Sequence, residues 1–240
     1  MLDGQWCWLI RSNQDGINFA LFSAPATSPG RQYWHLLRAH DPHVMLEGVS
    51  LNQQALVLSL RENGLPIIEV QPQGQMAYRV QLPDAAYSLY VQDSLEFDST
   101  VIRLRYEALN RPAQVRQLEL ASGAQQVLKQ TPVLGPFDAD SYVSQRVWAT
   151  AADGTQVPIS LVARRDVLGS SAPLYLYGYG AYGEALDSWF SIARLELLER
   201  GAAFAVAHVR GGGERGEPWY LNGKMAHKEN SFDDFLAARE

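Results

Sequence analysis

The sequence predicts a mixed fold with two parts, an all-β region over residues 1–135 and an α/β region over residues 136–240. In the first part, short apolar and β-branched runs alternate with turn-forming residues, as in sheets of short strands. In the second part, two continuous apolar runs flank a helical pattern, as expected for strands that helices cover on both faces. The residue pattern changes from the first kind to the second near residues 133–137, which contain Gly135 and Pro136.

The strands of the first part fall into repeating groups. Two groups of four strands follow each other between residues 44 and 131, and a group of three precedes them. The second strands begin near Trp6, Ala55 and Val101, close to the roughly 40–50-residue spacing of β-propeller blades. Blades bury both faces against neighbours, so we expect a partial β-propeller and further sequence upstream. A β-sandwich of the same strands stays an alternative.

A hairpin is expected at the start of the second part. Residues 141–150 and 156–163 have the pattern of paired strands. Between them, Asp153-Gly154 fits a two-residue type I′ turn, in which Gly tolerates positive φ. Pro158 has no backbone N–H, so we expect its strand at the edge of a sheet.

A strand–helix–strand unit is expected over residues 174–209, compatible with a right-handed crossover. Gly201 ends the helix, whose apolar face is predicted to contain Phe190, Ala193, Leu197 and Leu198. A further helix is expected to begin with Ser231 as N-cap and Asp234 three residues later. Its predicted apolar face contains Phe232, Phe235 and Leu236, and the sequence is expected to stop inside this helix.

Composition narrows the classes of function. The net charge of −6 at pH 7 gives no electrostatic reason to bind nucleic acid or an anionic membrane. No run approaches the ~18 apolar residues that span a bilayer, and the first ten residues lack the features of a secretory signal. The single cysteine, Cys7, is expected in the core and excludes an internal disulfide, which favours a reducing compartment such as the cytoplasm.

Two glycine-rich blocks follow the predicted α/β strands, YGYGAYG at residues 177–183 and RGGGE at residues 210–214. In open α/β sheets, ligands bind outside the carboxyl ends of the strands. Glycine permits tight turns and close backbone approach, and a tyrosine hydroxyl can stabilise charge on a carbonyl oxygen. A turn with packed aromatic rings explains the same residues.

These blocks, together with RLELLERG, AVAHVRGGGERGEPWYLNGK and NSFDDFLAA, resemble the prolyl oligopeptidase family of serine peptidases, and within it the oligopeptidase B branch. The resemblance covers nearly the whole chain. It implies the last blades of a β-propeller over residues 1–135 and the start of an α/β-hydrolase domain over residues 136–240. It also implies cleavage of short peptides after Arg or Lys through an acyl-enzyme, with no metal or organic cofactor. Cleavage after Pro, or a non-catalytic β-propeller binding module, stays open.

The resemblance also implies roles for three residues. Tyr179 matches the family's side-chain donor to the oxyanion. Tyr182 matches an aromatic position that lines the specificity pocket, and Asp187 matches an acidic position near the second substrate subsite. Trp189 stands where a further acid is often found, which weakens the expected recognition of basic residues there.

The family's catalytic serine lies in a G-G-S-x-G-G elbow that this sequence does not contain. None of its serines is predicted on a strand–turn–helix elbow. We therefore expect the 240-residue chain to be inactive alone, with upstream and downstream parts of the same protein as its partners. His208 is expected to be a hydrogen-bonded core residue, and residues 210–214 to support the site through turns and a buried ion pair.

Overall fold

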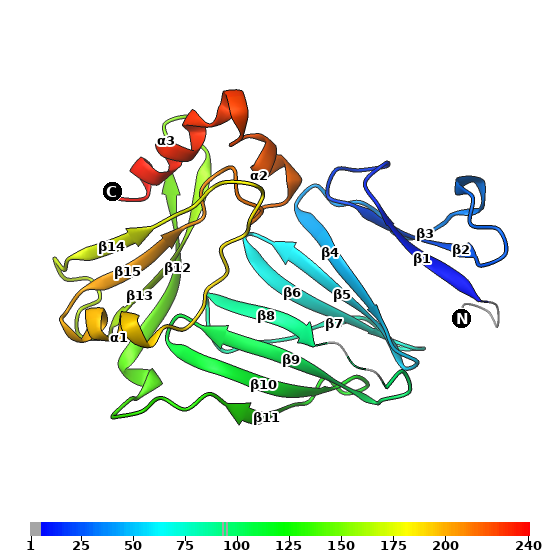
Figure 1. Cartoon of the computed structure of the whole chain (residues 1–240), viewed down its shortest axis with the longest axis horizontal. Helices are drawn as coiled ribbons and strands as arrows, with labels where there is room; N and C mark the ends of the chain where they lie inside the picture. Colours follow the sequence, from blue (N-terminus) through cyan, green and yellow to red (C-terminus); the bar gives the residue numbers. More distant parts are fainter. Residues whose placement is uncertain (1–5, 93, 95) are drawn as a thin grey trace.

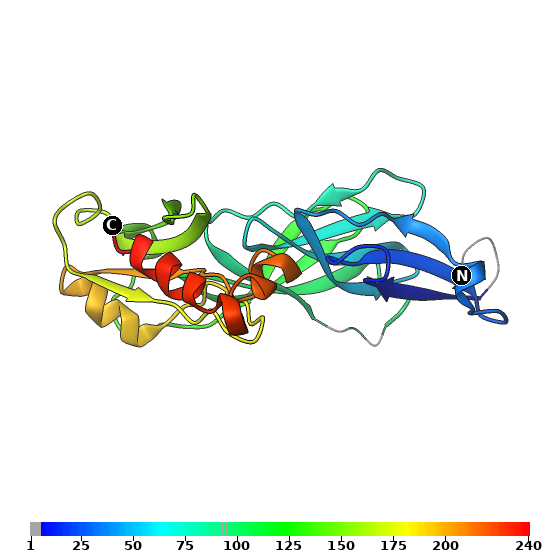
Figure 2. The same ribbon diagram turned by 90° about the horizontal axis from the view of Figure 1, so that it is seen from above.

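The computed structural model describes residues 6–92, 94 and 96–240. Its strands form four sheets, which follow one another from the N-terminal end of the molecule to the C-terminal end (Figure 1). Seen from above, the molecule is elongated, with the first sheet at one end and the fourth sheet at the other (Figure 2). Within the described ranges, every helix is too short or too polar to cross a bilayer.

The first three sheets contain only antiparallel pairs of sequence neighbours. The first sheet contains β1 (Cys7–Ser12), β2 (Ala20–Pro25) and β3 (His35–Arg38), with the 3-10 helix η1 (Arg31–Tyr33) before β3. The second contains β4 (Val44–Leu51), β5 (Ala55–Glu62), β6 (Leu65–Pro72) and β7 (Tyr78–Arg79). The third contains β8 (Tyr87–Gln92), β9 (Val101–Ala108), β10 (Arg111–Glu119) and β11 (Gln125–Gln130). The predicted grouping of the strands is confirmed.

The second sheet is buried on both faces, because successive side chains of a strand point to opposite sides. On β5, Ala55 and Val57 join an apolar cluster with residues of the third sheet. Leu58 and Leu60 join another cluster with Leu21 of the first sheet. A β-sandwich would bury one face of each sheet, so this packing supports propeller blades instead. Cys7 is half-buried on the outer strand β1, and the expectation of a core cysteine is wrong.

The fourth sheet has the order β12-β13-β15-β14. Only β14 and β15 pair in parallel, and α1 connects them. The elements of this part are η2 (Ala139–Ser141), β12 (Tyr142–Thr150), β13 (Gln156–Arg164), β14 (Leu174–Tyr177), α1 (Ile192–Glu199), β15 (Ala203–Ala207), α2 (Glu217–Leu221), η3 (Met225–His227) and α3 (Glu229–Ala237). Ser191 caps α1, and Gly201 follows it at φ +80°. The strand–helix–strand prediction is confirmed, but its helical apolar face is wrong at two positions, because Phe190 precedes α1 and Ala193 is exposed.

Helices α1 and α3 cover opposite faces of this sheet (Figure 1). On β15, Phe204 and Val206 pack in a cluster with Leu198 of α1. The alternating residue Ala205 packs in the cluster that contains Phe235 of α3. Both faces of β15 are therefore buried, as its continuous apolar sequence predicts.

The predicted hairpin exists, but two of its details are wrong. Only Gly154 in its loop has positive φ, whereas a type I′ turn needs positive φ at both central residues. The loop is longer, because the closing hydrogen bond runs from Ala151 N–H to the Thr155 carbonyl. Pro158 lies in β13, which is an interior strand between β12 and β15.

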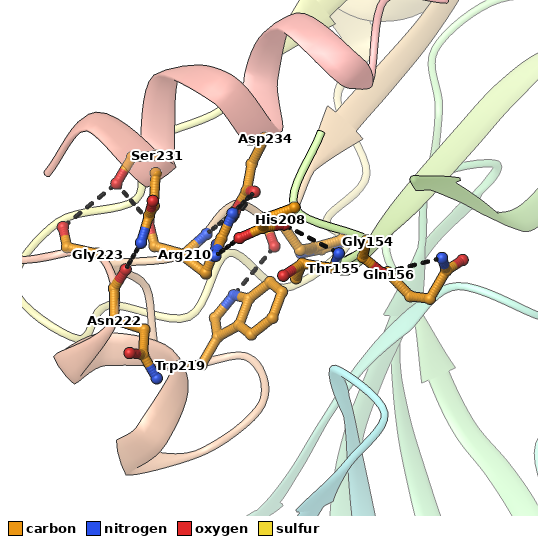
Figure 3. A network of polar contacts seen from close by, with 12 residues as sticks. Gly154, Thr155, Gln156, His208, Arg210, Trp219, Asn222, Gly223, Ser231 and Asp234 are labelled. Atoms are coloured by element: carbon orange, nitrogen blue, oxygen red, sulfur yellow. Dashed lines mark hydrogen bonds and ion pairs between the residues drawn. The ribbon is translucent and has the colours of Figure 1, made fainter. Parts of the chain in front are cut away.

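An indole compensates for the proline in this interior strand. Pro158 lies opposite His208, and the Pro158 carbonyl accepts the His208 N–H at 3.0 Å. Proline has no N–H to return to the His208 carbonyl. Trp219 Nε1 donates to that carbonyl instead, at 3.1 Å (Figure 3). The edge prediction fails because a side chain from α2 replaces the missing ladder bond.

Helix α3 begins earlier than predicted, with Lys228 as its N-cap. Ser231 therefore lies within the first turns, and its hydroxyl donates to the Arg210 carbonyl at 2.6 Å. Phe232 and Leu236 are exposed, so the predicted apolar face is wrong at these two positions, whereas Phe235 packs against the sheet as predicted. The buried positions of α3 are polar, Ser231 and Asp234. These two side chains bond to the second glycine block instead of joining an apolar core.

Candidate functional site

The two glycine-rich blocks touch each other through their backbones, just beyond the carboxyl ends of β14 and β15. The N–H of Gly183 donates to the Gly211 carbonyl at 3.0 Å, and the N–H of Gly213 donates to the Glu184 carbonyl at 3.2 Å. Gly211 has φ +96°, and a Cβ there would lie 2.1 Å from the Gly180 carbonyl oxygen. Position 211 therefore excludes every side chain, and the shape of each block depends on the other.

Arg210 anchors the second block through a buried ion pair. Its Nε and Nη2 donate to the Asp234 carboxylate at 2.6–3.1 Å, and its backbone N–H does so at 2.8 Å (Figure 3). Nη1 donates to Asp153 at 2.6 Å. The bonds to Asp234 raise the pKa of Arg210, and the bond from Arg210 lowers the pKa of Asp153 to about 2. The predicted buried ion pair of this block is confirmed.

A second buried polar cluster lies beside the first. Ser160 Oγ is 2.8 Å from His208 Nε2, and Arg146 Nη1 donates to the same hydroxyl at 2.7 Å. Glu214 Oε1 lies 3.6 Å from His208 Nδ1. A Ser, a His and a Glu thus meet in the order of a nucleophilic triad, but all three are fully buried. No substrate carbonyl reaches Ser160, so this cluster is structural.

The surroundings of His208 disfavour its protonated form. Burial is the main cause that lowers its pKa, and the nearby Arg146 guanidinium lowers it further against the opposing effect of Glu214. The prediction that His208 is a hydrogen-bonded core residue is confirmed. Among residues 6–92, 94 and 96–240, no group of three His, Cys, Asp or Glu side chains is arranged to hold a metal ion.

Tyr179 and Tyr182 lie in the exposed loop after β14. Tyr179 is two residues beyond the end of the strand and is 46% exposed, so its ring is not sequestered in a core. Tyr182 is 87% exposed and has φ +57°. A positive φ is an outlier for a bulky side chain, and such strain is concentrated at functional sites. The loop therefore presents two phenol groups at the ligand-binding end of the sheet.

Asp187 lies in a covered position, with its side chain 10% exposed. Arg61 of β5 donates to both carboxylate oxygens, at 2.7 and 3.3 Å. The Tyr90 hydroxyl of β8 donates to the same carboxylate at 2.8 Å. Arg61 also pairs with Glu47 of β4 at 2.5 Å. The carboxylate therefore ties the loop after β14 to the second and third sheets.

These contacts shift the pKa values of both partners of Asp187. Burial opposes the charge on Arg61, but Asp187 and Glu47 outweigh it, so the pKa of Arg61 is raised. Burial, followed by the negative charge of Asp187, raises the pKa of Tyr90 to about 12. Sequence analysis missed both partners. A charged residue inside the apolar strand ALVLSLRE was the available signal for Arg61, because a buried charge requires a partner.

Further contacts join the β-sheet part to the α/β part. Arg146 Nη2 donates to the Asn63 carbonyl in the β5–β6 turn at 2.8 Å. The N–H of Phe190 donates to Glu107 of β9 at 3.0 Å. Residues of both parts also line a cavity of about 230 Å³ at this junction. The site loops are thus held in place by the blades as well as by the fourth sheet.

Comparison with known families gives two matches. Residues 3–131 match the prolyl oligopeptidase N-terminal β-propeller domain, and residues 188–240 match the prolyl oligopeptidase family. The chain is 39% identical over 232 residues to dipeptidyl aminopeptidase BI of Pseudoxanthomonas mexicana, covering 95% of this chain and 32% of that protein. It is 34% identical over 231 residues to protease 2 of Moraxella lacunata, covering 96% and 33% respectively.

A solved structure of oligopeptidase B from Leishmania major superposes on 99% of this chain, with a TM-score of 0.88 and 32% identity. The match covers 35% of that structure. The chain spans about a third of the length of these two curated relatives.

Proposed function

The chain belongs to the prolyl oligopeptidase family of serine peptidases, and from this premise we propose that it forms part of an oligopeptidase that cleaves short peptides after Arg or Lys. The likeness to protease 2 and to oligopeptidase B supports an oligopeptidase, and cleavage after Arg or Lys is what the sequence's resemblance to the oligopeptidase B branch implies. In the proposed protein, the blades lie beside the opening strands of an α/β-hydrolase domain. The boundary falls near residue 135, in the segment between the end of β11 at Gln130 and the start of η2 at Ala139.

The exposed phenol of Tyr179 carries the proposal. Its hydroxyl donates a hydrogen bond to the oxygen that becomes negatively charged when a serine attacks the substrate carbonyl. A donor of this kind stabilises the transition state more than the ground state, and its loss typically slows turnover by ~10²–10³. The attacking serine, the base and the acid come from sequence outside this chain. The 240-residue chain is therefore inactive by itself.

Tyr182 and Asp187 complete the proposed substrate contacts. Tyr182 lines the primary specificity pocket, and its exposure in the loop after β14 supports that role. Asp187 belongs to the second subsite, where a basic side chain of the substrate shares the carboxylate with Arg61. Because Arg61 already neutralises Asp187, the attraction at this subsite is weaker than that of a free carboxylate.

Three alternatives differ in substrate or in class. Cleavage after Pro is the specificity that the family name suggests. Release of dipeptides from a free amino terminus is favoured by the 39% identity to dipeptidyl aminopeptidase BI. A non-catalytic β-propeller module that binds a partner requires no chemistry. The proposed oligopeptidase resides in the cytoplasm, for which the single cysteine is the support.

The test uses the longer protein that contains this chain, purified and assayed with three fluorogenic peptides. The first has a blocked amino terminus and Arg before the scissile bond. The second has a blocked amino terminus and Pro before the scissile bond. The third is a dipeptide with a free amino terminus that is joined directly to the fluorophore. We expect the first to be cleaved fastest. Preference for the second or third assigns the corresponding alternative, and no cleavage supports the binding module. Labelling of the isolated chain by a fluorophosphonate would contradict its inactivity.

A further inference from the structure

Helix α3 holds the backbone on both sides of Tyr179. Before it, Gly178 lies against the ring of Phe235, where a Cβ would come within 2.9 Å of Cδ2. After it, Gly180 is buried with φ +61°, and a Cβ there would lie 3.5 Å from Ser231 Cβ of α3 and 2.4 Å from Val209 Cγ2, beyond the end of β15. The exposed tyrosine is therefore flanked by two glycines at which the surrounding packing leaves no room for a side chain.

Lys228 makes the polar contact that fixes this segment. Its Nζ donates to the carbonyl of Gly180, the residue directly after Tyr179, and to Ser231 Oγ at 3.2 Å. The Ser231 hydroxyl in turn donates to the Arg210 carbonyl at 2.6 Å, next to the pair of Arg210 with Asp234 (Figure 3). One side of α3 thus connects the first glycine block to the second.

The side chain of Lys228 does not act as a helix cap. Lys228 is the N-cap of α3, where its side chain makes no capping hydrogen bond. A positive charge at a helix N-terminus is unfavourable, because the backbone dipole is positive there. In the part of the chain that the structure describes, no carboxylate lies within ion-pair distance of its ammonium group. Its ammonium group contacts the Gly180 carbonyl, Ser231 Oγ and, at 5.9 Å, the Phe232 ring, and of these only Gly180 lies outside α3.

We propose that Lys228 is a positioning residue for Tyr179: its ammonium group fixes the Gly180 carbonyl and thereby sets the direction of the tyrosine hydroxyl. The inference rests on the proposed function, in which that hydroxyl stabilises the oxyanion. A displaced donor loses its effect in the transition state, while the ground-state contacts of the substrate are unchanged. A displacement of about 1 Å costs roughly 10²-fold in rate. Loss of Lys228 therefore lowers kcat and leaves KM unchanged.

The experiment is a double-mutant cycle in the longer protein, with the blocked Arg substrate. Lys228→Met is expected to lower kcat by about 10- to 100-fold, with KM within about twofold of the wild-type value. Lys228→Arg keeps a donor and is expected to recover part of the loss. In the Tyr179→Phe background, Lys228→Met is expected to change kcat by less than about threefold, because residues that act as a unit are non-additive.

The matched control is Lys224→Met. Lys224 precedes η3 and lies over the Tyr220 ring at 4.3 Å, and its removal is expected to leave kcat unchanged. The inference is overturned if Lys228→Met keeps wild-type kcat, if its effect multiplies fully with that of Tyr179→Phe, or if Lys224→Met has an equal effect. If Lys228→Met fails to fold, full activity of Lys228→Ala, which also removes the donor, overturns it equally. An inactive wild type, or a fully active Tyr179→Phe, refutes the proposed function instead.

Discussion

Replacement of Asp234 by Asn tests what holds the second glycine block. Asp234 is 0% exposed and accepts hydrogen bonds from the backbone and the guanidinium of Arg210. Asn keeps the size of the side chain but removes its charge and turns an amide NH₂ toward donors. Removal of one partner of a buried ion pair costs about 3–5 kcal/mol. Because Asp153 still pairs with Arg210 at 2.6 Å, we expect the lower end, about 3 kcal/mol.

The assay is urea unfolding of the 240-residue chain, wild type and variant, supported by a measurement of the melting temperature Tm. For 150–250 residues, each kcal/mol shifts Tm by about 2–4 °C, so Asp234→Asn is expected to lower Tm by about 6–12 °C. Asp153→Asn is the matched control. Its side chain is 49% exposed, and solvent screening limits the loss to about 1 kcal/mol or less. Equal losses for both variants would refute the claim that the buried pair anchors the block.

Two further changes test the neighbouring polar groups. Asp187→Asn leaves the buried Arg61 with Glu47 as its remaining ion-pair partner. Urea unfolding is expected to show a loss of about 3 kcal/mol in the free energy of unfolding. A loss below ~0.5 kcal/mol would contradict the claim that Asp187 links the β-sheet part to the α/β part. His208→Gln is expected to reduce the acid sensitivity of folding. Because the pKa of His208 is lowered in the folded chain, the unfolded chain takes up a proton below pH ~6.5 that the folded chain does not. The free energy of unfolding of the wild type therefore falls by up to ~1.4 kcal/mol per pH unit as the pH drops through that value. Parallel curves of unfolding free energy against pH for wild type and variant would contradict this.

Local patterns were sufficient to predict the strand groups and the crossover unit. Alternating side chains reveal a strand without knowledge of its neighbours, and the helix between β14 and β15 has its cap and its terminal Gly201 in the sequence. The hairpin turn was wrong because Asp-Gly occurs in several turn types, and loop length decides between them. The edge assignment of Pro158 was wrong because the compensating indole of Trp219 comes from a distant helix.

The positions of candidate site residues were predictable where they directly follow a strand. Tyr179 was placed correctly in the segment after β14, because an apolar run followed by glycines marks the end of a strand. The partners of Asp187 were not predictable, since Arg61 and Tyr90 reach it through tertiary packing of the blades. Ser231 was misassigned as a cap because serine favours helix starts, whereas here its hydroxyl bonds to a carbonyl of another loop.

The role of Tyr179 is tested most directly by the kcat of Tyr179→Phe in the longer protein, with the blocked Arg peptide as substrate. The substitution removes one hydroxyl from a half-exposed ring, so folding should be unaffected. A fall in kcat of about 10²–10³, with KM within about threefold of wild type, is the expected result. A kcat within about threefold of the wild-type value would show that the phenol does not stabilise the oxyanion.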